Sequence, residues 1–186
     1  ISTFSLYPGK NLGAYGDAGI ISTNNKKLYL IMRKLRNLGS EIKFKHELVG
    51  MNSRLDTLQA VILNHKLSKL SKLNLKRKKI ADDYDKKINN KKILKLTYSK
   101  NSVYHQYVIL VKKRNELIKY LKKSNIQYGF HYPYAIHQLS VFKKKFKNKK
   151  FKNAEILAKE SISIPIDPNL TKKEMNYIVN TLNEFW

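Results

Sequence analysis

Cysteine is absent from this chain of 186 residues. A disulfide framework and thiolate chemistry are therefore excluded, which suits a protein of a reducing compartment. No apolar run approaches the roughly 18 residues that a membrane-spanning helix needs. The first residues also lack the basic region leading into an apolar one that marks a secretory signal. We therefore expect a cytoplasmic protein, and its hydrophobic fraction of 42% is sufficient for a globular core.

Carboxylates are scarce as well, because 13 Asp and Glu oppose 38 Lys and Arg and the formal net charge is +25. Such a charge can indicate a nucleic acid or an acidic membrane as partner. Arginine, which bidentate phosphate recognition favours, occurs only at positions 33, 36, 54, 77 and 114, and lysine is spread over every predicted helix. We therefore attribute the charge to a general lysine bias and expect neither partner. The denser run from Lys143 to Lys152 fits this interpretation least.

Metal-ligand and dinucleotide-binding patterns are also missing. The five histidines show no His-x-x-x-His spacing on a predicted helix and no nearby carboxylate cluster, so we expect no metal site. Gly13, Gly16 and Gly19 do not form the Gly-x-Gly-x-x-Gly spacing of a dinucleotide loop, which disfavours a Rossmann fold.

What the chain does contain is one lysine in an unusual setting. Lys10 follows a Pro8-Gly9 turn, Ser5 lies five residues earlier, and glycines and other small residues crowd the stretch that follows. A tight turn leaves such a lysine few positions, unlike the many lysines on predicted helices. The alternative is an ordinary surface lysine at a turn.

Periodicity predicts an order of elements that changes after residue 90. We expect strands at residues 1–5 and 20–23, a helix around 28–35 ended by Gly39, and a loop over 40–50. A long helix is predicted from Ser53 to about Ile88, with Ser53 and Asp56 spaced as a capping box and a break near Leu73 as an alternative. Beyond it we expect strands at 93–98, 103–111, 126–131 and 162–164 and helices at 114–124, 153–160 and 171–185. The lysine-rich segment at 138–152 is expected to be irregular or weakly helical. This second part is a small α+β arrangement.

Four blocks of sequence carry a resemblance to a known family. They are residues 3–19 with Ser5 and Lys10, residues 50–60 (Gly-Met-Asn-Ser-Arg-Leu-Asp-Thr-Leu-Gln-Ala), His131-Tyr132-Pro133, and residues 164–168 (Ile-Pro-Ile-Asp-Pro). In this order they resemble the DegT/StrS-type sugar aminotransferases, which are pyridoxal-phosphate enzymes of fold type I. The resemblance covers the whole chain and implies the C-terminal half of such an enzyme, because a portion of similar size comes first in the family.

The resemblance implies an α/β fold class: the C-terminal part of a pyridoxal-phosphate-dependent transferase large domain, followed by a small α+β domain. We place a remnant of the large domain at residues 1–52, a linking helix at 53–90 and the small domain at 91–186. In the family, the groups that stack on the cofactor ring and the carboxylate that holds its pyridine nitrogen belong to the N-terminal part. We therefore expect this chain alone to be at most weakly active, or a companion chain to supply the rest.

By the same resemblance, Lys10 would carry pyridoxal 5'-phosphate as a Schiff base, which requires an amine that can shed its proton and attack an aldehyde. The amine could then move the substrate proton as general acid and base. Ser5 would hydrogen-bond the cofactor phosphate. Its alternative is an ordinary strand serine.

Further residues are implied on the partner and substrate sides. Asn52 matches an asparagine that reaches the cofactor phosphate of a neighbouring subunit, which would require a homodimer with a shared active site; its alternative is a helix N-cap. Arg54 would lie near the bound sugar nucleotide, or be a surface residue. His131 and Tyr132 would face the substrate, or be a packed aromatic strand end.

The implied activity is transfer of an amino group from an amino acid, usually glutamate, to a keto carbon of a nucleotide-linked sugar, for surface polysaccharide or other amino-sugar products. A sugar dehydratase of the same cofactor class would carry histidine in place of Lys10. Two further alternatives are a basic nucleic-acid-binding module, recognised by strongly salt-dependent DNA binding, and an inactive gene remnant.

Overall fold

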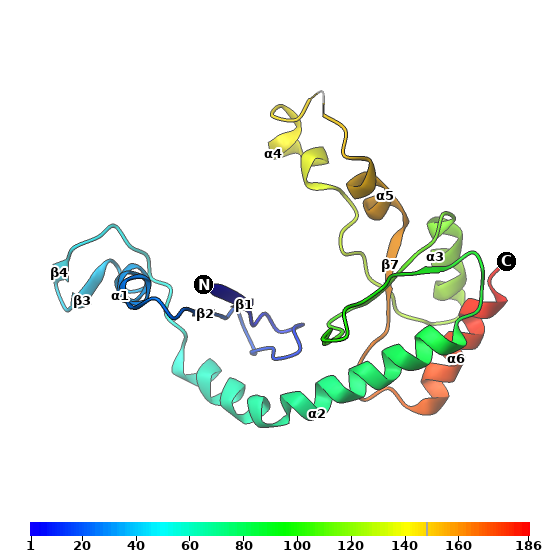
Figure 1. Ribbon diagram of the computed structural model, residues 1–186, viewed down its shortest axis with the longest axis horizontal. Helices are drawn as coiled ribbons and strands as arrows, with labels where there is room; N and C mark the ends of the chain where they lie inside the picture. Colours follow the sequence, from blue (N-terminus) through cyan, green and yellow to red (C-terminus); the bar gives the residue numbers. More distant parts are fainter. Residues whose placement is uncertain (148) are drawn as a thin grey trace. The chain divides into compact units, whose positions relative to one another are not determined.

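The computed structural model describes residues 1–147 and 149–186 (Figure 1), and by its internal contacts the chain divides into two compact units, Ile1–Lys72 and Leu73–Trp186. We refer to them as unit 1 and unit 2. The elements in chain order are β1 (Ser2–Ser5), β2 (Gly19–Ser22), α1 (Lys26–Leu35), β3 (Ser40–Ile42), β4 (Lys45–His46), α2 (Thr57–Lys87), β5 (Leu94–Lys95), β6 (Tyr107–Leu110), α3 (Arg114–Lys123), the 3-10 helix η1 (Ile136–Gln138), α4 (Ser140–Lys143), α5 (Lys152–Glu160), β7 (Ser161–Ile164) and α6 (Lys172–Glu184). Within the described residues, no helix combines the length and the apolar character that crossing a bilayer requires.

In unit 1, β1 and β2 form an antiparallel pair whose register runs from Ser2 opposite Ser22 to Ser5 opposite Gly19. Both predicted strands are therefore confirmed, and they pair with each other. Every residue of the two strands is exposed in this chain. The pair forms the base from which the segment between Leu6 and Ala18 extends.

Helix α1 follows directly and confirms the predicted helical period. The Asn25 side chain caps it by accepting the Leu28 amide at 3.1 Å. The predicted glycine after its end is also confirmed: Gly39 has φ of +79°, and a Cβ there would lie 1.6 Å from the Leu48 carbonyl oxygen. Only glycine combines this backbone angle with this close approach.

The predicted loop over residues 40–50 is wrong, because β3 and β4 form a short antiparallel hairpin there. Its turn contains Phe44 at φ of +68°, a conformation that a bulky residue rarely adopts and that no Asn-Gly or Asp-Gly signal announces. Contacts from outside hold the hairpin: Glu47 pairs with Lys34 of α1, and the Glu47 amide donates to the Gly39 carbonyl at 3.0 Å. The adjacent carboxylate raises the pKa of the Lys34 ammonium.

Helix α2 is continuous over 31 residues, so the alternative of a break near Leu73 is not observed. It begins at Thr57, and its first backbone hydrogen bond runs from the Ala60 amide to the Asp56 carbonyl at 3.0 Å. Ser53 lies four residues before the helix and therefore does not form the predicted capping box. The boundary between the two units falls within this helix. The predicted division into residues 1–52, 53–90 and 91–186 instead treats the helix as a separate part. The contact-based division differs because the first half of α2 packs in unit 1 and the second half in the core of unit 2.

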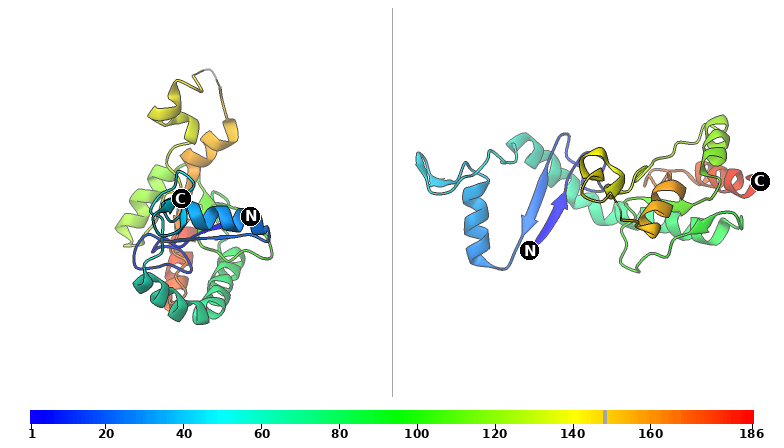
Figure 2. Two further views of the ribbon diagram at one scale, coloured as in Figure 1. Left: turned by 90° about the vertical axis from the view of Figure 1, so that its left-hand side faces the viewer. Right: turned by 90° about the horizontal axis from the view of Figure 1, so that it is seen from above.

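Unit 2 is built on a three-stranded antiparallel sheet in the order β5-β6-β7, with its core against α2, α3 and α6 (Figures 1 and 2). Alternation along β6 buries Tyr107 and Ile109 completely. Burial raises the pKa of the Tyr84 and Tyr107 phenols, so both stay protonated and donate. Tyr84 donates to the Pro165 carbonyl at 2.7 Å, and Tyr107 donates to Asp85.

The helices predicted for this unit are confirmed, and one strand is not. Thr171 and Glu174 form the predicted capping box of α6. The predicted strand over 126–131 is wrong, because only Gly129 pairs, exchanging two hydrogen bonds of 3.0 and 2.9 Å with Ser163. The predicted strands at 93–98 and 103–111 are confirmed only in part, since β5 and β6 are shorter.

Replacing the fully buried Leu182 with alanine should lower the free energy of unfolding by about 2–5 kcal/mol, because it leaves a cavity between α6 and the sheet. Leu75→Ala is the matched control, since Leu75 is 61% exposed on α2. Urea denaturation of both variants checks this. Equal losses would contradict the described core.

Candidate functional site

The loop that carries Lys10 is closed on itself by backbone hydrogen bonds. The Leu6 amide donates to the Ala18 carbonyl at 2.9 Å, and the Leu6 carbonyl accepts from the Ala14 amide at 2.8 Å. The Lys10 amide donates to the Tyr7 carbonyl at 2.8 Å and completes the turn over Pro8 and Gly9. The Lys10 side chain is partly buried. The predicted turn is therefore present. The hydrogen bonds of Tyr7 and Leu6 fix the backbone of the loop that contains Lys10.

Gly13 allows this loop to close. A Cβ built on Gly13 would lie 2.2 Å from the Pro8 carbonyl oxygen and 2.7 Å from its carbonyl carbon. Both contacts are to backbone and cannot be relieved by a rotamer change. By contrast, a Cβ on Gly9 would meet only the Tyr7 ring, at 3.8 Å.

The first half of α2 fastens the loop a second time. The Tyr15 amide donates to Gln59 Oε1 at 2.8 Å, and Lys66 Nζ donates to the Gly13 carbonyl. Beneath these bonds, a small core buries Leu6, Ala14 and Leu63. The loop is thus positioned by the β1-β2 pair at its base and by a helix along its side.

Ser5 ends β1 at the foot of this loop. Its Oγ accepts the Tyr7 amide at 3.4 Å, and its hydroxyl proton remains available for donation. A hydroxyl donor and an amine on one closed loop fit an aldehyde-bearing phosphate ester, since the hydroxyl can bind the phosphate and the amine can bind the aldehyde. The donor set therefore fits pyridoxal phosphate.

Asn52 and Arg54 are brought together with a third residue, Asn37. Arg54 Nε donates to Asn52 Oδ1 at 3.1 Å and Arg54 Nη1 donates to Asn37 Oδ1 at 3.4 Å, while Asn37 and Asn52 also form an isolated backbone bridge. The N-cap alternative for Asn52 is wrong, because α2 begins five residues later at Thr57. Asn37 carried no signal in the sequence.

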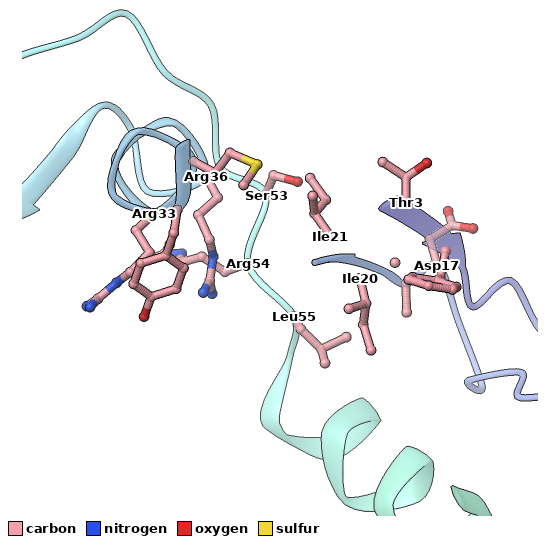
Figure 3. Close-up of a pocket in the computed structure, with 14 residues that line it drawn as sticks. Thr3, Asp17, Ile20, Ile21, Arg33, Arg36, Ser53, Arg54 and Leu55 are labelled. Atoms are coloured by element: carbon pink, nitrogen blue, oxygen red, sulfur yellow. The ribbon is translucent and has the colours of Figure 1, made fainter. Parts of the chain in front are cut away.

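An open pocket of about 760 Å³ lies in unit 1 between the β1-β2 pair, α1 and the segment before α2 (Figure 3). Arg33, Arg36 and Arg54 lie along one side of it, with Asp17 on the opposite side. Three of the five arginines of the chain thus line one pocket. The roles of Arg33 and Arg36 were not predicted from the sequence, although their rarity in a lysine-rich chain and their spacing of three at the end of a predicted helix were available signals.

His131 and Tyr132 lie in unit 2, after the short pairing of Gly129 with Ser163. His131 Nδ1 lies 2.9 Å from Ser163 Oγ, and the two rings meet edge to face with centroids 5.7 Å apart. The Tyr132 side chain is 71% exposed, so the packed-strand alternative does not describe it. In the described part of the chain, no three His, Asp or Glu side chains gather as a metal site would require.

A family model, that of the DegT/DnrJ/EryC1/StrS aminotransferase family, matches residues 1–183. A "Pleiotropic regulatory protein" of Geobacillus stearothermophilus is 37% identical over 191 residues, with 100% of this chain and 51% of the relative covered. A dTDP-3-amino-3,6-dideoxy-alpha-D-galactopyranose transaminase of Aneurinibacillus thermoaerophilus is 40% identical over 200 residues, with 97% and 55% covered.

Among solved structures, DesV of S. venezuelae in complex with a ketimine intermediate superposes with a TM-score of 0.91 at 32% identity, covering 98% of this chain and 50% of that one. Another solved relative holds the cofactor PMP. The chain thus spans about half the length of the relatives it matches. These matches show what fraction of each relative the chain covers. They do not support the expected placement of the chain in the C-terminal half of such an enzyme.

Gly13→Ala should destabilise the chain by about 1–3 kcal/mol, because the new Cβ pushes the Pro8 backbone away and opens the loop. Gly9→Ala should be close to neutral in the same turn. Thermal unfolding of the two variants is the measurement. A Gly13→Ala chain as stable as the parent would show that the loop does not need this close approach.

Proposed function

Since the chain belongs to the DegT/DnrJ/EryC1/StrS aminotransferase family, we propose that it takes part in the transfer of an amino group from an amino acid to a keto carbon of a nucleotide-linked sugar. The observation that carries the proposal is Lys10, held in a loop that Gly13 allows to close and that α2 fastens. Relatives named as dTDP-sugar and UDP-sugar aminotransferases support the substrate class.

Aminotransferases of this family depend on pyridoxal phosphate. When bound, that group supplies an aldehyde that carries the amino group and a ring that accepts electrons from the reacting carbon. In this chain Lys10 Nζ would hold it covalently, and the Ser5 hydroxyl would donate to its phosphate. Once substrate releases the Lys10 amine, that amine would take the proton from the substrate carbon that bears nitrogen and deliver it to the former aldehyde carbon of the group.

The contacts of Asn52 define which way its amide faces. A guanidinium only donates, so the atom of Asn52 that receives Arg54 Nε must be the oxygen. The Asn52 amino group carries two donors of the kind that an anion accepts. This supports the proposal that Asn52 donates to the cofactor phosphate of a neighbouring protomer in a homodimer with a shared active site.

Arg54 acquires a second role from this geometry. Two of its five N–H donors are engaged by the Asn52 and Asn37 carbonyl oxygens, and Nη2 is left to face an anion. We therefore assign Arg54 as a positioning residue for Asn52 that can also contact the substrate. Arg33 and Arg36 line the same pocket and suit the phosphates of a nucleotide.

Other parts of the sequence-based reading remain predictions. These are the contacts of His131 and Tyr132 with the sugar, glutamate as donor, a cytoplasmic location, and weak activity of this chain by itself. The exposed Tyr132 ring and the His131 imidazole, oriented by Ser163, support the first of them.

Titration of the chain with pyridoxal phosphate should produce an absorption band of the lysine adduct that Lys10→Ala removes. Lys27→Ala, on the exposed face of α1, should keep it. A band that survives Lys10→Ala at full intensity would place the adduct on another lysine and overturn the proposal. A stable chain that shows no band in either form would also count against it.

Arg54→Ala should weaken pyridoxal-phosphate binding about tenfold, because Asn52 loses the charged donor that orients its amide. Arg33→Ala is the matched control, since it removes an arginine of the same pocket without touching Asn52. Fluorescence titration gives both dissociation constants. Equal weakening in the two variants would indicate a general loss of positive charge instead of a loss of orientation.

A further inference from the structure

Residues 134–147 and 149–152 of unit 2, which we name the basic excursion, carry an unusual density of positive charge. The chain leaves the sheet after Gly129 and returns through α5, and in Figure 1 η1 and α4 stand off from the three-stranded sheet of this unit. Seven of the ten residues from Lys143 to Lys152 are lysines. No Asp or Glu occurs between Glu116 and Glu155. The described lysines of this run are all exposed.

The basic excursion has a small packing centre of its own. Ring centroids lie 6.4 Å apart for Phe142 and Phe146, 5.9 Å for Phe146 and Phe151, and 4.8 Å for Phe151 and His137. His137 Nε2 in turn lies 3.0 Å from Glu155 Oε1 at the start of α5. These contacts pack η1, α4 and the start of α5 against one another.

Several large apolar side chains are left outside this centre. Tyr134 is 66% exposed, Ile136 69% and Val141 75%. They lie two to nine residues before Lys143, so exposed apolar side chains are followed along the chain by the exposed Lys143, Lys144 and Lys145. Apolar side chains near a lysine cluster supply the second component of an interfacial membrane-binding surface, the apolar area that a bilayer can bury.

We propose that the basic excursion binds the surface of a lipid bilayer that carries anionic headgroups, with the lysines at the headgroup level and Ile136 and Val141 in the interface. Clustered lysines beside an apolar face are the composition that binds anionic lipid, through both charge and buried apolar area. This departs from the expectation of no membrane partner, because that expectation rested on lysines spread evenly over the helices.

A nucleic acid explains these observations less well. The chain contains no arginine after Arg114, whereas planar bidentate contact with phosphates favours arginine. Exposed aliphatic side chains such as Ile136 and Val141 have no partner on a phosphate backbone, but they have one in a bilayer interface. The proposal does not depend on Lys10 or on any residue of the candidate site in unit 1.

Helix α3 provides an internal control of equal charge. Lys119, Lys122 and Lys123 are exposed like Lys143, Lys144 and Lys145, yet no exposed large apolar side chain accompanies them among the described residues of α3. If charge alone bound the membrane, both triplets would contribute equally. If the excursion is the binding surface, only its own triplet should matter.

The test is co-sedimentation of the 186-residue chain with vesicles of phosphatidylcholine alone and of phosphatidylcholine mixed with phosphatidylglycerol. We expect binding only to the mixed vesicles. The triple variant Lys143→Glu, Lys144→Glu, Lys145→Glu should weaken it at least about tenfold, and Lys119→Glu, Lys122→Glu, Lys123→Glu should change it little. Ile136→Ser with Val141→Ser should weaken it without changing the net charge, and serves if the charge variant fails to fold.

Three outcomes would overturn the proposal. The first is no binding to the mixed vesicles at low salt. The second is equal weakening by the two lysine triplets, which would indicate non-specific attraction. The third is tighter binding to random duplex DNA than to vesicles, with no effect of the Ile136 and Val141 substitutions, which would assign the surface to nucleic acid.

Discussion

The approach of the Gly13 backbone to the Pro8 carbonyl is the constraint on which the candidate site depends. It lets the chain fold back under its own turn, so that Leu6 can bond to Ala14 and Ala18 and the Lys10 backbone is held between them. A lysine on an open loop would sample many positions, and a covalent cofactor needs its amine at one of them. The glycine therefore contributes to the site through the absence of a side chain.

Two cationic side chains act in unit 1 as structural donors. Lys66 of α2 holds the loop by donating a hydrogen bond to the Gly13 carbonyl. Arg54 orients the Asn52 amide because its guanidinium can only donate and so selects the Asn52 oxygen. In a chain with a net charge of +25, these contacts distinguish placed cations from solvated ones. A different property separates the basic excursion from α3: exposed apolar side chains precede the exposed lysines of the excursion, and none accompanies those of α3 among its described residues.

Local chemistry predicted much of this fold. The turn before Lys10, the glycine after α1 and the capping box of α6 were all readable, because each depends on a few adjacent residues. The β3-β4 hairpin was not, because its turn places Phe44 at a positive φ that no local residue signal announces, and Glu47 beside it is held by Lys34 and Gly39. The strand at 126–131 failed for a similar reason: its apolar pattern was correct, but β7 offers it one pairing position, at Ser163. The contribution of Asn37 could not be predicted from the sequence, because it depends on a hydrogen bond from Arg54, seventeen residues away.

Unit 2 closes by joining its first helix to its last. Asn90 Nδ2 donates to the carbonyls of Leu182 and Phe185, the Asn89 amide donates to Asn183 Oδ1, and Asn183 Nδ2 donates back to the Lys87 carbonyl. These contacts join residues more than ninety positions apart. During synthesis, the Lys87 carbonyl and the Asn89 and Asn90 donors therefore lack these partners until α6 has emerged. Contacts of such high sequence separation form slowly, so closure of this unit depends on the whole stretch from α2 to α6 being available at once.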